Sequence, residues 1–188
     1  YNPSPKSFVL SPLRLLHSLQ MPSRYTLIFL GTPPFAVPSL QVLAKEFDVL
    51  LVVTQPDKPV GRKQMMTAPP VKVAAEEMGL RVFQPERVNE ELPAFLQQEG
   101  IARPDFLVTV AYGKILSQAV LDLPAIAAVN LHGSVLPRWR GASPIEHAIL
   151  NGDSETGVSV QIMVKALDAG PVLSALSIPL TEHDTSLS

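Results

Sequence analysis

The sequence predicts an α/β fold with a mostly parallel, doubly wound sheet and an antiparallel hairpin at one end of that sheet. Short β-branched runs alternate with amphipathic stretches of helical periodicity, and Gly, Pro and Asn turns separate them. Parallel neighbours require crossover connections, so helices are expected on both faces of the sheet. In such folds ligands bind beyond the carboxyl ends of the strands, which makes the loops after strands the places to seek a site.

The expected elements occupy most of the chain after residue 24. Predicted strands are 25–30, 49–54, 81–83, 106–111, 127–132, 158–164 and 172–178, and predicted helices are 37–46, 71–78, 90–98 and 145–150. Residues 165–170 join the last two strands and are too few for a crossover, which predicts the hairpin. With 188 residues, of which 46% are hydrophobic and 17% charged, the chain has room for one such domain and not for a second.

Composition argues against several classes of function. The formal charge of −2 disfavours a protein that coats nucleic acid through its net field, so any polyanion contact is expected to be local. The absence of cysteine excludes disulfides, thiol nucleophiles and thiolate metal sites. No Gly-x-Gly follows the first strand, where the chain reads Gly31-Thr32-Pro33-Pro34, and this disfavours a dinucleotide-dependent oxidoreductase. No apolar run is long enough to span a membrane.

Residues 1–24 differ in composition from the rest. They carry Lys6, Arg14 and Arg24 and no acidic residue. One interpretation is an organellar transit peptide, which would place the protein in a mitochondrion or plastid. The other, which we favour, is a stretch upstream of a true start at Met21, and it leaves a bacterial cytoplasmic protein as the expectation.

Three polar residues form a candidate catalytic group. Asn130 and His132 lie two apart on a predicted strand and therefore project from the same face, and Asp168 lies at the tip of the predicted hairpin. Each has a structural alternative, since Asn130 can satisfy loop backbone, His132 can be a hydrogen-bonded core residue and Asp168 can be a turn residue. Together they suit acyl transfer between two nitrogens.

The chemistry assigns a task to each of the three. Acyl transfer passes through a tetrahedral intermediate whose oxyanion the Asn130 amide and a His132 imidazolium can stabilise. Asp168 can hold the imidazolium and relay protons between the two nitrogens. No metal and no nucleophilic side chain is required.

The loop at 133–145 places Trp139, the only tryptophan, between Arg138 and Arg140. A solvated loop with one hydrophobic anchor is the alternative, but loops of this length in compact domains are usually functional. The run Asn-Leu-His-Gly-Ser-Val-Leu-Pro-Arg-Trp-Arg-Gly-Ala-Ser-Pro-Ile at 130–145 resembles the signature of the folate-dependent formyltransferases, in the form that acts on methionyl-tRNA. The similarity extends over nearly all of residues 25–188 and includes the segments 29–36, 54–59, 83–85, 110–113, 152–157 and 167–170.

The resemblance implies a Rossmann-like catalytic domain over residues 25–188, with Asn130, His132 and Asp168 as its catalytic trio. It also implies 10-formyltetrahydrofolate as the formyl donor and no metal. The donor is expected to contact Ser134, Val135, Leu136 and Pro137, where Val135 replaces a leucine of the family, and its pterin pocket is expected along Ala111, Tyr112 and Gly113.

The acceptor implied by the resemblance is initiator methionyl-tRNA. The loop at 54–72 aligns with the loop that wedges into the tRNA acceptor stem in the family. Arg62 is retained, whereas Lys63 replaces a glycine and Gln64 and Met65 replace two lysines, so the loop loses one net positive charge and with it some affinity. A merely exposed basic loop is the alternative. The expected tRNA contacts are Arg62, Lys63, Arg138 and Arg140.

Family members continue beyond the equivalent of Ser188, through the rest of the catalytic domain and into a small β-barrel that helps to grip tRNA. This predicts weak or absent turnover on tRNA by the chain alone and a partly uncovered sheet. Separately, we expect a monomer. Three alternatives stay open: a sister formyltransferase that acts on a small-molecule amine, a formyl-folate hydrolase, and an inactive fragment that binds folate or RNA.

Overall fold

The computed structural model describes residues 24–186. Seven strands form one sheet: β1 (Thr26–Gly31), β2 (Asp48–Val53), β5 (Val82–Phe83), β6 (Phe106–Val110), β7 (Ala127–His132), β8 (Glu155–Ile162) and β9 (Val172–Pro179). Two more, β3 (Lys58–Val60) and β4 (Met65–Thr67), pair as a separate hairpin. The helices are the 3-10 turn η3 (Pro34–Ala36), α1 (Val37–Glu46), α2 (Pro70–Glu77), α3 (Val88–Gln98), α4 (Gln118–Leu121) and α5 (Pro144–Leu150).

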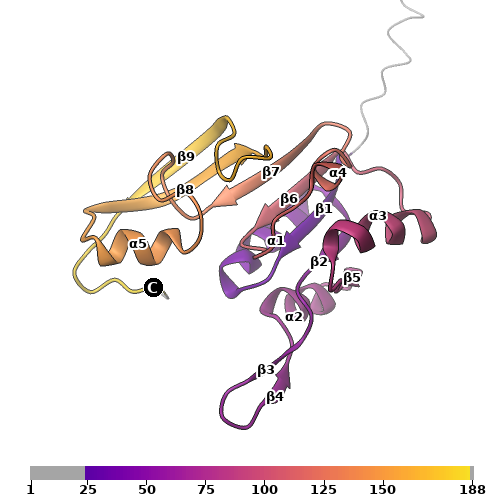
Figure 1. Cartoon of the computed structure of the whole chain (residues 1–188), viewed down its shortest axis with the longest axis horizontal. Coiled ribbons are helices and arrows are strands. Elements are labelled where there is room, and N and C mark those ends of the chain that lie inside the picture. Colours follow the sequence, from indigo (N-terminus) through magenta and orange to yellow (C-terminus); the bar gives the residue numbers. More distant parts are fainter. Residues whose placement is uncertain (1–23, 187–188) are drawn as a thin grey trace, which may run out of the picture.

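The order of strands in the sheet is β5-β2-β1-β6-β7-β8-β9 (Figure 1). The first five are parallel, whereas β8 runs antiparallel to both β7 and β9. The predicted fold class and the hairpin at one end of the sheet are therefore confirmed. Each predicted strand and helix is present, and its ends lie within three residues of the predicted ones.

The sheet is covered by helices on both faces, as a doubly wound fold requires. One core cluster joins alternate residues of β1 and β2, such as Ile28 and Leu51, to Leu92 of α3. The other joins the intervening strand residues to α1 and α2, where Leu40 is fully buried. Complete burial of such a leucine contributes about 1.5–3 kcal/mol, so this alternation of faces fixes the strand register.

Between β1 and β6 the strand order reverses, because the chain adds β2 and β5 on one side of β1 and then returns to its other side. A crevice opens at such a point beyond the carboxyl ends of the strands. The loops that begin there are 32–33 after β1 and 111–117 after β6, and the loop after β7 lies beside them in the sheet order. The topology therefore gathers the loops that the sequence singles out as functional.

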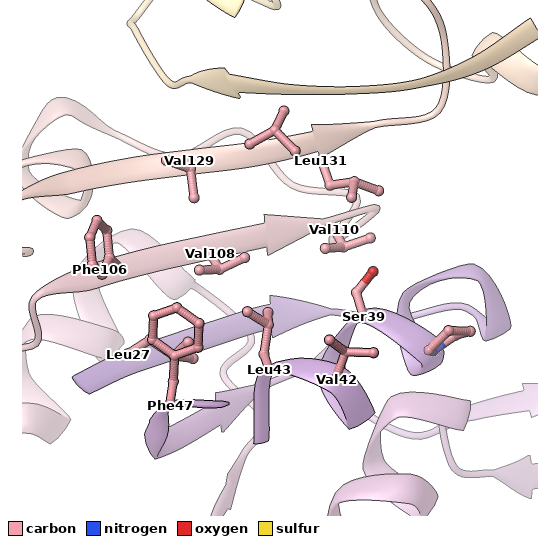
Figure 2. Close-up of a pocket in the computed structure, with 12 residues that line it drawn as sticks. Leu27, Ser39, Val42, Leu43, Phe47, Phe106, Val108, Val110, Val129 and Leu131 are labelled. Atoms are coloured by element: carbon pink, nitrogen blue, oxygen red, sulfur yellow. The ribbon is translucent and has the colours of Figure 1, made fainter. Parts of the chain in front are cut away.

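An apolar groove of about 510 Å³ lies on the α1 face of the sheet (Figure 2). It is lined by side chains of α1 and of the central and later strands, among them Leu43, Phe106, Val108, Val129 and Leu131. Ser39 supplies the only polar side chain of its lining. Asn130 and His132 alternate with Val129 and Leu131 along β7, so the groove is on the face opposite the candidate catalytic residues.

Four elements were not predicted. The segment 54–72 contains the β3–β4 hairpin, which projects from the body of the protein (Figure 1). Its strands have three exposed residues each and include Pro59, so they show no alternation of buried and exposed positions. The four-residue helix α4 and the 3-10 turn η3 are likewise too short for a periodic signal.

The two interpretations of residues 1–24 fall almost wholly outside the described residues, which begin at Arg24. Within residues 24–186, no helix is both long and apolar enough to cross a membrane.

Candidate active site

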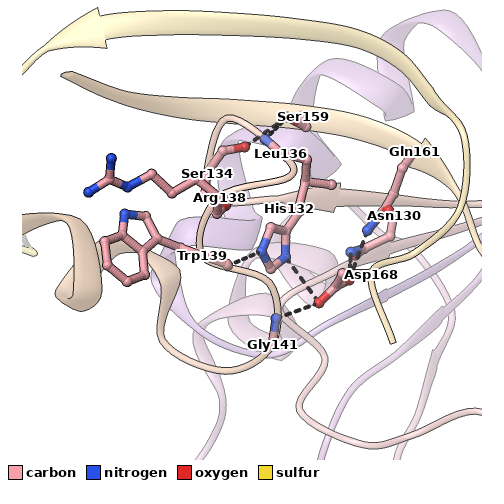
Figure 3. Close-up of polar contacts among 10 residues, drawn as sticks. All are labelled: Asn130, His132, Ser134, Leu136, Arg138, Trp139, Gly141, Ser159, Gln161 and Asp168. Carbon is pink, nitrogen blue, oxygen red and sulfur yellow. Dashed lines mark hydrogen bonds and ion pairs between the residues drawn. The ribbon is translucent and has the colours of Figure 1, made fainter. Parts of the chain in front are cut away.

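The fold brings Asn130, His132 and Asp168 together at the carboxyl end of β7 (Figure 3). Asn130 Nδ2 lies 3.4 Å from Asp168 Oδ1, and His132 Nδ1 lies 3.7 Å from Asp168 Oδ2. The side chains of His132 and Asp168 are only 7% and 9% exposed. Two strand residues and a residue of the later hairpin loop therefore form one nearly buried polar group.

Asp168 is held by donors from several segments. Gly141 donates its backbone N–H to Oδ2 at 2.9 Å, and Gln161 donates from Nε2 to Oδ1 at 2.8 Å. With Asn130 and His132, four groups face the two carboxylate oxygens. Charge-assisted hydrogen bonds of this kind are about twice as strong as neutral ones, so the carboxylate is fixed in place and in orientation.

His132 has an acceptor at each ring nitrogen. Its Nε2 lies 2.8 Å from the carbonyl oxygen of Trp139, and its Nδ1 faces the Asp168 carboxylate. A carbonyl oxygen can only accept, so Nε2 carries a hydrogen. The distance of 3.7 Å between Nδ1 and Asp168 Oδ2 suits an ion pair and is too long for a hydrogen bond.

The loop after β7 is tied to β8 by a pair of serines. Ser134 Oγ donates to the carbonyl of Arg138 at 2.7 Å. Ser159, fully buried on β8, donates to the carbonyl of Ser134 at 2.8 Å and accepts from the backbone N–H of Leu136 at 3.0 Å. Of the predicted folate contacts, Ser134 is buried, Val135 and Leu136 are partly buried and Pro137 is exposed, so the first three form a fixed side of the site.

Asp153 anchors the same loop further along. Its carboxylate accepts from Arg138 at 2.6 Å and from Trp139 Nε1 at 2.6 Å. The Arg138 guanidinium lies 4.8 Å from the Trp139 ring centre, and His147 stacks on that ring at 5.5 Å. Arg138 is thus already engaged within the loop, whereas Arg140 is exposed and has no hydrogen bond or ion pair within residues 24–186.

The loop after β6 forms another wall of the site. The carbonyl of Tyr112 accepts from Thr32 Oγ1 at 3.0 Å and from Gln55 Nε2 at 2.8 Å, which ties this loop to those after β1 and β2. Gly113 has a φ of 84°, which favours glycine, and a Cβ there would lie 2.6 Å from Gln55 Nε2 and displace that side chain. Tyr112 itself points into the core, where burial, and then the charge of Glu91, raise the pKa of its hydroxyl to about 12.

Left-handed backbone conformations concentrate around these loops. The described residues other than glycine with positive φ are Gln64, Ala111, Trp139, Ser143 and Asp168, and all but Gln64 lie on loops of the site. Such residues cost about 1–3 kcal/mol each and persist where surrounding contacts over-determine them. The hydrogen bonds to Trp139 and Asp168 described above are contacts of that kind.

The remaining predicted site residues lie apart from this group. Arg62 and Lys63 occupy the exposed tip of the β3–β4 hairpin, which extends away from α5 and β8 (Figure 1). Neither has a hydrogen bond or ion pair in the described part of the chain. At the base of the hairpin, the pKa of the Asp57 carboxyl is lowered. The larger cause is a hydrogen bond from Gln84, and the next is a hydrogen bond from Lys72.

Sequence reasoning missed four contributors to the site. Gln161, Ser159, Asp153 and the backbone of Gly141 all hold the trio or its loop. Gln161 and Ser159 occupy alternate positions of β8, and polar residues on the inward face of a strand are a signal that could have identified them. No arrangement of His, Asp and Glu in residues 24–186 is suited to holding a metal ion.

Known proteins are similar to this chain over most of its length. The formyl transferase family matches residues 26–188. Methionyl-tRNA formyltransferase of Listeria innocua is 49% identical over 162 residues, and that of Hydrogenobaculum sp. is 47% identical over 159 residues. These alignments cover 85% and 84% of the chain but 51% of either relative, so the chain spans about half the length of the curated relatives that it matches.

Solved structures share the fold at lower identity. Phosphoribosylglycinamide formyltransferase from Streptococcus pneumoniae superposes with a TM-score of 0.67 at 23% identity, covering 86% of each chain. A formyltetrahydrofolate deformylase from Pseudomonas syringae gives 0.65 at 17% identity, covering 86% of this chain and 53% of that one. The match over residues 26–188 and the identity to curated relatives together show that the chain belongs to the formyl transferase family.

Proposed function

We propose that this chain is the formyl-transferring part of a methionyl-tRNA formyltransferase, which moves a formyl group from 10-formyltetrahydrofolate to the amine of initiator methionyl-tRNA. The observation that carries the proposal is the Asn130, His132 and Asp168 group, assembled and nearly buried at the carboxyl end of β7. The identity of 47–49% to curated enzymes of that name supports the choice of substrate.

The residues of this group suit each step of the transfer. The amine attacks the formyl carbon and forms a tetrahedral intermediate whose oxygen becomes negative. The carbon–nitrogen bond to the folate then breaks, the amine nitrogen loses one proton and the folate nitrogen gains one. Asn130 has a second amide hydrogen to offer the oxyanion, because a single one faces Asp168. Within this group, Asp168 is the base that can accept the proton from the amine.

His132 has a contact that bears on its part in the reaction. Its Nε2–H is given to the Trp139 carbonyl in this structure, so donation to an oxyanion requires that contact to open. Until then His132 acts through its contact with Asp168. This makes the loop that carries Trp139 a participant in the proposed reaction.

Two loops are suited to the formyl donor. Ala111 and Gly113 are exposed beside the site, and positive φ at both turns the backbone of this segment away from the sheet. The segment of Ser134 to Pro137 lies along the other side, fixed to β8 by Ser159. Peptide N–H and C=O groups on both sides match the donors and acceptors along the edge of a pterin. These two loops support the proposal that this part of the chain holds the formyl donor.

Contact with tRNA is proposed for the hairpin and for Arg140. Arg62 and Lys63 are exposed and have no partner in the described chain, so both side chains are available to bind phosphate groups. Arg138 is a weaker candidate because Asp153 already neutralises it. As a formylating enzyme, the whole protein would act as a monomer where translation is initiated with formylmethionine, in the bacterial cytoplasm or, if residues 1–24 are a transit peptide, in an organelle.

The test is formylation of methionyl-tRNA with 10-formyltetrahydrofolate, by the chain and by the full-length protein that contains it. Transfer that disappears in Asn130→Ala would support the proposal. Glycinamide ribonucleotide and water are the competing acceptors, measured as formylated product and as released formate. Preference of wild type for either one, with methionyl-tRNA ignored, would refute it.

A further inference from the structure

Gln161 is a buried polar residue on β8 that lies outside the catalytic trio and outside the signature loop. It is 2% exposed, and its Nε2 donates to Asp168 Oδ1 at 2.8 Å. Its Oε1 is buried and has no partner among the described residues. A buried polar atom without a partner destabilises the folded state, because it has lost its hydrogen bond to water. An apolar side chain of similar length would avoid this destabilisation. The hydrogen bond from the Gln161 amide to Asp168 is therefore expected to compensate for the unpaired Oε1.

The strand register explains why Gln161 reaches the site. It lies directly opposite Asn130 in the antiparallel pair of β7 and β8, and His132 lies opposite Ser159. Residues opposite each other share a face, so Gln161 projects toward the trio. Figure 3 shows Gln161 and Asn130 on one side of the Asp168 carboxylate and His132 and Gly141 on the other.

This arrangement gives the two carboxylate oxygens different partners. Oδ1 receives Gln161 Nε2 and Asn130 Nδ2, and Oδ2 receives the Gly141 N–H and faces His132. The Asn130 contact is long at 3.4 Å, so the shorter bond from Gln161 is the main restraint on Oδ1. Loss of that bond would leave Oδ1 with only the long Asn130 contact, and the carboxylate could then rotate and withdraw Oδ2 from the Gly141 N–H and from His132.

The amide of Gln161 also depends on the charge of Asp168. An ionised carboxylate accepts hydrogen bonds only, so it orients the N–H end of the amide toward itself. An apolar residue at position 161 would remove this restraint. A carboxylate there would repel Asp168, because two carboxylates in contact share a proton rather than ionise together.

We propose that Gln161 is a positioning residue for formyl transfer, whose amide holds Oδ1 of Asp168 so that Oδ2 stays directed at His132. The expected effect of Gln161 on the rate of formyl transfer rests on the proposed function. Its expected effect on the orientation of Asp168 rests on the structure alone. The two consequences can be tested separately.

The kinetic test uses the full-length protein with three substitutions. Gln161→Met keeps the length and removes the donor, and kcat should fall by about tenfold, while KM for methionyl-tRNA and for the folate stays within about twofold. Gln161→Glu adds a second carboxyl, and the pH of half-maximal rate should rise by about one unit or more. Gln97→Glu makes the same chemical change on the exposed side of α3 and should leave both quantities at the wild-type values.

The geometric test is a crystal structure of Gln161→Met beside that of wild type. The Asp168 carboxylate should rotate and move away from the Gly141 N–H. If the Met variant does not fold, Gln161→Asn, which is too short to reach Oδ1 and stays polar, replaces it in both tests with the same expected results.

An unchanged Asp168 in the variant crystal would overturn the inference, as would wild-type kcat and pH dependence in Gln161→Met and Gln161→Glu. A raised KM with unchanged kcat would also overturn it, because it would make Gln161 a substrate-binding residue. If wild type does not formylate methionyl-tRNA but Asp168 rotates in the variant, the proposed function fails and the positioning of Asp168 by Gln161 stands.

Discussion

The polar corner of Asn130, His132 and Asp168 at the end of β7 and the β3–β4 hairpin are both proposed to be functional, yet they are built in opposite ways. In the corner, each polar side chain has partners from distant segments, and His132 and Asp168 are less than a tenth exposed. In the hairpin, every strand residue is exposed, and Arg62 and Lys63 have no partner among the described residues. Side chains that stabilise a transition state must be held in place before the reaction, whereas side chains that bind a flexible polyanion can be free charges.

The strongest test of this contrast is Asp168→Asn, which keeps the size and removes the charge. We expect kcat for formyl transfer to fall about 10³-fold, because proton transfer and the support of His132 disappear together. Folate binding, measured by calorimetry, should change little. Asp122→Asn is the matched control, since that carboxylate is exposed at the end of α4 and accepts a hydrogen bond from Gln118. A reduction below tenfold in Asp168→Asn would show that the corner is structural.

The trio could be predicted from the sequence because its residues carry a local pattern. Asn130 and His132 share a strand face by their spacing, and Asp168 lies in a recognisable turn. The alternating helices and strands of the core were predicted for the same reason, since the period of apolar residues is a local property.

The supporting contacts could not be predicted in this way. Asp153 meets Trp139 across 14 positions, and Gln161 faces Asn130 only because β8 adopts one register against β7. Register depends on the whole sheet and on close approaches such as that at Gly157, where a Cβ would lie 1.9 Å from the Leu176 carbonyl oxygen. The β3–β4 hairpin was missed because it buries nothing and therefore has no apolar period.

A smaller effect is expected when a contact that holds the Trp139 loop against the corner is removed. Asp153→Ala removes the acceptor of Trp139 Nε1 and of Arg138, so the free energy of unfolding should fall by about 2 kcal/mol and kcat by roughly tenfold as the Trp139 carbonyl drifts from His132. Chemical denaturation and steady-state kinetics measure the two effects. Arg138→Ala keeps the Trp139 bond and removes an ion pair whose arginine is 64% exposed, so its cost should be below about 1 kcal/mol. Equal costs in the two variants would mean that the ion pair, and not the Trp139 bond, fixes the loop.

The hairpin should respond through binding alone. Replacement of Arg62 and Lys63 by glutamine should weaken tRNA binding by a few-fold and reduce the slope of log K against log salt by about 0.9 for each phosphate that is no longer neutralised. Stability should stay within about 0.5 kcal/mol, since both side chains are exposed. Binding of tRNA by the full-length protein, measured between about 50 and 200 mM salt, is the test, with Lys45→Gln on α1 as control. An unchanged slope would remove the hairpin from the interface.

The smallest effect concerns Tyr112, which belongs to the corner through its backbone and to the core through its side chain. Its hydroxyl is buried with no partner among the described residues, so Tyr112→Phe should be neutral or stabilising by up to about 1 kcal/mol at neutral pH. Burial raises the pKa of Tyr112 to about 12 from 10.0, which means that the folded state favours the protonated phenol. The stability that this provides is present below pH 10 and disappears as the pH rises through 12, because the unfolded chain releases that proton first.

Denaturant midpoints of wild type and Tyr112→Phe from about pH 8 to 12 test this. The advantage of the phenylalanine variant should grow above about pH 10, and Tyr25→Phe, which removes a hydroxyl from a partly buried ring, corrects for general alkaline unfolding. A constant difference between wild type and Tyr112→Phe would mean that water reaches the phenol. The loop of Ala111 to Gly113 would then be as open as the hairpin, and the contrast between a fixed corner and a free hairpin would hold only for the residues around Asp168.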